Sequence, residues 1–123
     1  MSFWTFIAAG GLSTIWLIVH LVLGGRDIVL PLLAASQLSP VVRDTQYLCW
    51  HFTSAAILCI AGFFFWAAFS ASLAPAIAAT MLAGAFTLTG IGLVALRGGS
   101  HLELPQGWLF LPVTALGLVG ILS

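Results

Sequence analysis

Four long apolar runs without a charged side chain limit what this chain can fold into. They cover approximately residues 3–24, 46–70, 75–96 and 104–122, and none contains Lys, Arg, Asp or Glu. A helix needs roughly 20 apolar residues to cross a hydrocarbon core of about 30 Å. Strands of a membrane barrel are about half that length and alternate in hydropathy, which these runs do not. The sequence therefore predicts an all-α integral membrane protein with four transmembrane helices.

Composition supports this class. Hydrophobic residues make up 62% of the 123 residues and charged residues only 5%, against about a quarter in soluble domains. Three basic residues in total are too few for the phosphate contacts that hold a nucleic acid. Because the four runs use most of the chain, we expect a single transmembrane domain over residues 1–123.

The connections between the runs differ in length and character. The connection at 71–74 is so short that the second and third helices must be antiparallel neighbours, which predicts an antiparallel bundle. The double glycines at 24–25 and 98–99 are typical helix stops. The longest connection, 26–45, has an apolar middle that is too short and too interrupted by proline to span. We expect a short interfacial segment there.

All charged side chains fall in the first and third connections, which lie on the same membrane face of a four-span chain. They are Arg26, Asp27, Arg43, Asp44, Arg97 and Glu103. The positive-inside rule places this face in the cytoplasm and both termini in the periplasm. The compact, lysine-free chain favours a bacterial inner membrane. The two Arg-Asp dipeptides bracket the long connection, so they either pair across it and dock it or remain solvated interfacial charges.

The three histidines converge on that same face. His20 and His51 each lie about five residues inside a span, so roughly 7 Å below the face, and His101 is in the third connection, two residues before Glu103. Neutral imidazole is a ligand for iron, copper and zinc. One hypothesis is axial ligation of haem b by His20 and His51, or a transition-metal site that adds His101 and Glu103. The alternatives are hydrogen bonds to neighbouring polar groups, and contacts with lipid or quinone head groups.

Function is less constrained than fold. Cys49 and Cys59 are separated by about 15 Å along one helix, so we expect no disulfide between them. Without an acid or a positioned nucleophile inside a span, we do not expect an enzyme. The chain is expected to act by association with a membrane-protein partner or with itself, in contact with the lipid bilayer. An accessory or assembly subunit of a bacterial inner-membrane respiratory or photosynthetic complex fits this best. The alternative is a redox protein that binds haem b or a transition metal.

Overall fold

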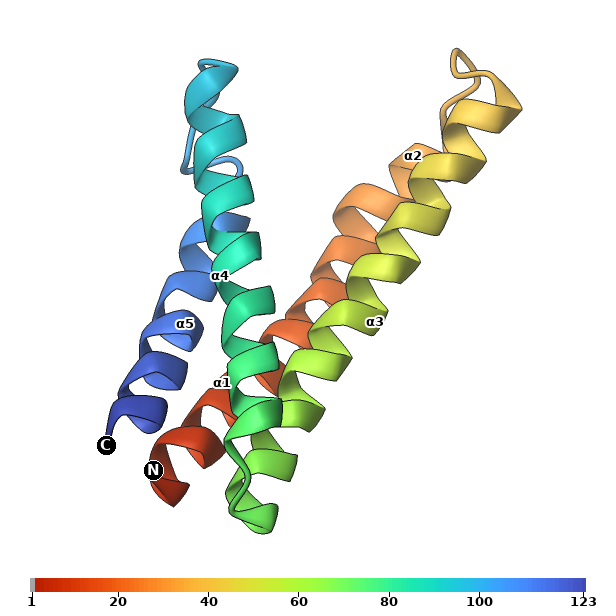
Figure 1. Cartoon of the computed structure of the whole chain (residues 1–123). Coiled ribbons are helices and arrows are strands. Elements are labelled where there is room, and N and C mark those ends of the chain that lie inside the picture. The colour runs from red at the N-terminus through yellow and green to blue at the C-terminus, as the bar shows by residue number, and fades with distance from the viewer. Residues whose placement is uncertain (1) are drawn as a thin grey trace.

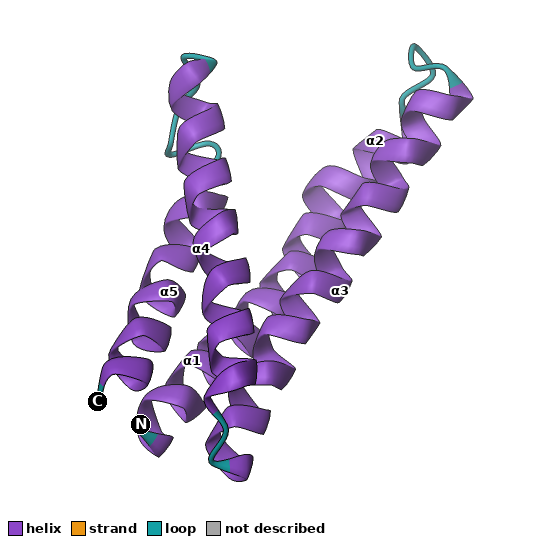
Figure 2. Cartoon of the chain, in the orientation of Figure 1, coloured by secondary structure: helices purple, strands orange, loops and turns teal. Residues whose placement is uncertain are grey.

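The computed structural model describes residues 2–123, and every regular element in that range is helical (Figure 2). The helices, traced in Figure 1, are α1 (Phe3–Val19), the π-helix η1 (His20–Val29), α2 (Leu30–Ala34), α3 (Pro40–Ser70), α4 (Leu73–Leu96) and α5 (Gln106–Leu122). Three continuous helices are long and apolar enough to cross a membrane: Phe3–Ala34, Pro40–Ser70 and Leu73–Leu96. The helix α5 is equally apolar but shorter, at 17 residues. The expectation of an all-α chain of membrane-protein type is confirmed at this level.

The first helix corrects the expected boundaries. It does not end at Gly24-Gly25 but continues through η1 and α2 to Ala34 without a break. The expected interfacial segment over 26–45 is therefore mostly helix, and only residues 35–39 form a non-helical connection. Two glycines cost a helix only about 1 kcal/mol each. Gly24 packs beside Trp50 of α3, and the helix continues where the local sequence preference predicted its end.

The four helices close into an antiparallel bundle at the end that holds both termini. There α1 packs against α3 and α5, and α4 packs against the same two helices. The backbone N–H of Ser2 donates to the carbonyl of Gly120 at 3.2 Å, which ties the first helix to the last. Phe6 and Phe64 stack at 6.3 Å in the centre and are fully buried. The core of the protein therefore lies at the uncharged end.

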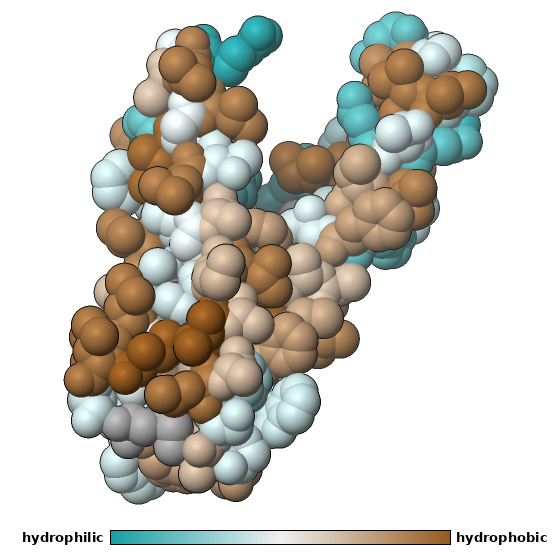
Figure 3. Space-filling view, in the orientation of Figure 1, coloured by the Kyte–Doolittle hydropathy of each residue, from teal (hydrophilic) through white to brown (hydrophobic). Residues whose placement is uncertain are grey.

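Toward the other end the bundle opens. The pair formed by the first helix and α3 leans away from the pair formed by α4 and α5, so the molecule has two arms (Figure 1). The space-filling view shows a hollow between the arms (Figure 3). The α4 and α5 pair stays tightly packed, because a Cβ added to Gly90 would lie only 2.6 Å from the Cα of Gly107. Close backbone contact through small residues is a common way for membrane helices to pack.

Candidate functional site

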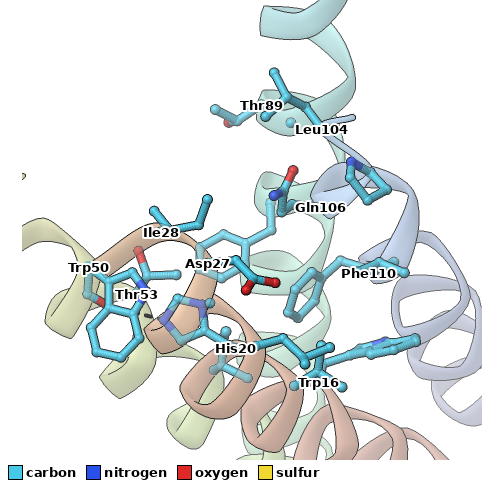
Figure 4. Close-up of a pocket in the computed structure, with 18 of the residues that line it drawn as sticks. Trp16, His20, Asp27, Ile28, Trp50, Thr53, Thr89, Leu104, Gln106 and Phe110 are labelled. Atoms are coloured by element: carbon cyan, nitrogen blue, oxygen red, sulfur yellow. Dashed lines mark hydrogen bonds between the residues drawn. The ribbon is translucent and has the colours of Figure 1, made fainter. Parts of the chain in front are cut away.

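A cleft of about 760 Å³ lies between the two arms. One wall comes from α1, η1 and α3, and the other from α4, α5 and the connection that precedes α5. The side chains that line it are mostly apolar, and its polar members are His20, Asp27, Thr53, Thr89, Glu103 and Gln106. In the close-up, Asp27 and Gln106 come from opposite walls, with Phe110 and Trp16 further toward the closed end (Figure 4). The cleft has the size and the mixed lining of a small-ligand site.

His20 is fixed against α3. Its Nε2 atom lies 3.0 Å from Ser54 Oγ and 3.4 Å from the carbonyl oxygen of Trp50. Its ring stacks on the indole of Trp50 with centroids 4.6 Å apart and planes 19° from parallel. Ser54 also donates to the Trp50 carbonyl at 3.1 Å, so the three groups form one small network. This hydrogen-bonding environment is one of the alternatives that the sequence left open for the histidine.

His51 approaches the same tryptophan from another direction. Its ring meets Trp50 edge to face at 5.0 Å and Tyr47 edge to face at 4.5 Å. Trp50 therefore contacts both rings, His20 by stacking and His51 by its edge. Two axial ligands must hold one ion between their nitrogens at about 2 Å each, whereas the Nε2 of His20 already has partners on α3.

The wider metal set does not assemble. His101 accepts a hydrogen bond from the indole N–H of Trp108 at 3.1 Å, outside the cleft lining, whereas Glu103 and His20 line the cleft. Over residues 2–123, no three His, Cys, Asp or Glu side chains lie close enough to hold a metal ion. The expected joint site of His20, His51, His101 and Glu103 is therefore not formed. Spacing along the chain does not give the distances between these side chains.

The charged dipeptides pair locally. Arg26 Nε contacts Asp27 Oδ1 at 2.6 Å, and Arg43 Nε contacts Asp44 Oδ1 at 3.1 Å. The expected pairing across the long connection is therefore not what the structure shows. Each arginine therefore uses the acid next to it in the sequence, and no ion pair joins the two dipeptides across residues 35–39.

Gln106 is a polar member of the cleft lining that the sequence did not indicate. Gln106, at the start of α5, faces the cleft, and the indole Nε1 of Trp16 is buried in the protein without a hydrogen-bond partner. The position of Trp16 one helical turn before His20 was visible in the sequence. Cys49 and Cys59 are both free and exposed, and neither lines the cleft.

Comparison with known proteins gives no relative: no family model matches the chain, and neither curated proteins nor solved structures contain a match.

Proposed function

We propose that this chain is a small integral membrane protein that acts by association, as an accessory or assembly subunit of a larger complex in a bacterial inner membrane, respiratory or photosynthetic. The observation that carries the proposal is the end of the longer arm. We call residues 29–45 the hairpin arm; it comprises α2, the connection 35–39 and the start of α3.

The hairpin arm is apolar but almost uncovered. Val29 is its only buried residue, and α2 has none. Its exposed large side chains are Leu30, Leu33, Val41 and Val42. Leu30 is 63% exposed and Val41 76% exposed. No other part of the bundle covers them, because α4 and α5 form the other arm (Figure 1).

The length of the two helices supports a position of this apolar surface beyond the hydrocarbon core. The first helix has 32 residues and α3 has 31, which correspond to about 48 and 46 Å. A tilt of about 40°, near the upper limit for membrane helices, reduces these extents along the membrane normal to roughly 36 Å. That still exceeds a core of about 30 Å. The dipeptide Arg43-Asp44 lies at this end, so it is the hairpin arm that reaches the head groups or passes them.

Exposed apolar residues in that zone favour contact with another protein. The positive-inside rule places the zone at the cytoplasmic side with both termini periplasmic. A subunit that meets the arm there, at the membrane surface, would cover Leu30 and Val41. A redox function with haem b or a metal is supported less well, because the ring of His20 already stacks on Trp50 and hydrogen-bonds to Ser54.

The test uses a photo-crosslinking amino acid at Leu30 or Val41 in the full chain in its native membrane. Leu88 on α4, 76% exposed, is the control position. We expect both arm positions to trap the same membrane protein and Leu88 to trap lipid. The double variant Leu30→Ser, Val41→Ser should release the chain from that complex on native gels while the chain remains folded. If the arm positions trap only a second copy of the chain, the partner is the chain itself and not another subunit. If every position traps only lipid, association through the hairpin arm is refuted.

A further inference from the structure

The charge balance of the cleft is negative. Asp27 and Glu103 line it from opposite walls, and none of the three arginines does. Arg26 pairs with Asp27 from outside the lining, through contacts of 2.6 and 3.1 Å. Glu103 has no ion pair within residues 2–123. An uncompensated carboxylate beside an apolar cavity is a favourable position for a cation.

The aromatic lining adds to this preference. Trp16, Trp50, Phe86 and Phe110 line the cleft, and the last two meet edge to face at 5.1 Å. The faces of such rings attract cations through their quadrupoles, tryptophan most strongly. The same rings provide apolar contact for a hydrophobic body. Carboxylates and ring faces together select for positive charge, whereas an apolar wall alone would accept any acyl chain.

Trp16 contributes its ring to the lining of the cleft, and its indole N–H is enclosed by protein. Buried polar groups in native proteins almost always have a partner, and this donor has none although Trp16 lines the cleft. It lies one helical turn before His20, toward the closed end. A molecule in the cleft therefore meets the ring of Trp16 and not its N–H.

We propose that the cleft binds a cationic amphiphile, a hydrophobic molecule with a protonated amine or quaternary ammonium group. The cation lies between Glu103 and Asp27, and the hydrophobic body packs on Phe86, Phe110 and Trp16. The volume of about 760 Å³ is ample for a drug-sized molecule. This inference does not depend on association through the hairpin arm, because Glu103 and the walls of the cleft lie outside residues 29–45.

Tetraphenylphosphonium is a suitable probe, and tetraphenylborate is its control, with nearly the same shape and the opposite charge. Isothermal titration of the full chain in an uncharged maltoside detergent, corrected for empty micelles, measures both. We expect saturable binding of one phosphonium ion per chain and no saturable binding of the borate. Equal binding of the two ions would overturn the proposal. The cleft would then be an apolar site without charge selectivity, of the kind that a neutral quinone occupies.

Variants locate the site. Glu103→Gln and Asp27→Asn should each weaken phosphonium binding by roughly tenfold, since each removes a charge while preserving shape. Asp44→Asn makes the same change at the hairpin arm, outside the cleft, and should have no effect. Asp27→Asn also removes the ion pair with Arg26. Glu103 lies on an exposed connection and has no such pair, so Glu103→Gln is the deciding variant. Wild-type affinity in Glu103→Gln, or an equal loss in Asp44→Asn, contradicts the proposal.

The cation can come from a free amphiphile or from the ammonium group of a lipid. Repeating the titration in nanodiscs of phosphatidylglycerol, with and without phosphatidylethanolamine, distinguishes these sources. Competition by phosphatidylethanolamine identifies the lipid head group, and unchanged affinity identifies a free amphiphile.

Discussion

Replacement of Gly90 by alanine should loosen the arm formed by α4 and α5, and the structure sets the size of the effect. An added Cβ would lie 2.6 Å from Gly107 Cα and 2.7 Å from Gly107 N. Ordinary carbon contacts are about 3.5–4.0 Å, so the two helices must separate by roughly 1 Å. Overpacking of this kind costs about 1–3 kcal/mol. The contacts are with backbone, which cannot move aside as a side chain end can.

Gly92 provides a matched control on the same helix. An added Cβ there meets nothing within 4 Å. Gly92→Ala should therefore show only the helix-propensity gain, about 0.5–1 kcal/mol of stabilisation. Gly90→Ala receives the same gain, so its net destabilisation should be about 1–2 kcal/mol.

The free energy of unfolding of both variants can be measured by circular dichroism in mixed micelles with increasing dodecyl sulfate. We expect Gly90→Ala to unfold at a lower dodecyl sulfate fraction than the wild type, and Gly92→Ala at an equal or higher one. If the two variants unfold together, α4 and α5 are not in backbone contact at Gly90 and the reasoning is refuted.

Two further predictions follow from the local geometry. Ser54→Ala removes the 3.0 Å hydrogen-bond partner of His20 and should lower the free energy of unfolding by about 1 kcal/mol in the same micelle assay. Ser70→Ala loses only an exposed hydrogen bond to its own helix and should change that free energy by only about a few tenths of a kcal/mol. Gly25→Ala should be neutral or stabilising, because its added Cβ meets nothing within 4 Å, whereas Gly98→Ala, at φ 65°, should cost about 1–2 kcal/mol. Equal effects within either pair would contradict the corresponding local structure.

The helical membrane class could be predicted from the sequence because uncharged runs of membrane length allow few other structures. The ends of the helices were harder to predict. The glycine pairs at 24–25 and 98–99 look alike in the sequence, but only Gly98 adopts the left-handed conformation that ends a helix. At Gly24-Gly25 the chain packs against α3 and remains helical. Tertiary contact therefore decided between two equal local signals.

The cleft could not have been predicted, because it exists only through the angle between two helix pairs. The residues that form it carry no shared motif: Glu103 precedes α5, Asp27 lies in η1, and Trp16 belongs to α1. Sequence periodicity identifies the apolar face of a helix, but it does not give the angle at which two helix pairs diverge.

The convergence of the histidines has a simpler physical basis than a shared ligand. Each of the three contacts a tryptophan: His20 and His51 contact Trp50, and His101 accepts a hydrogen bond from Trp108. Tryptophan concentrates near membrane interfaces, where its ring is in an apolar zone and its N–H can find an acceptor. Imidazole has the same mixed character, and stacking beside an indole covers its apolar faces while leaving nitrogen free for a polar partner. Two residue types that favour one depth will gather on one face without a metal to hold them. His20 and His101 each combine an indole neighbour with a hydrogen-bond partner, His20 through Ser54 and His101 through Trp108.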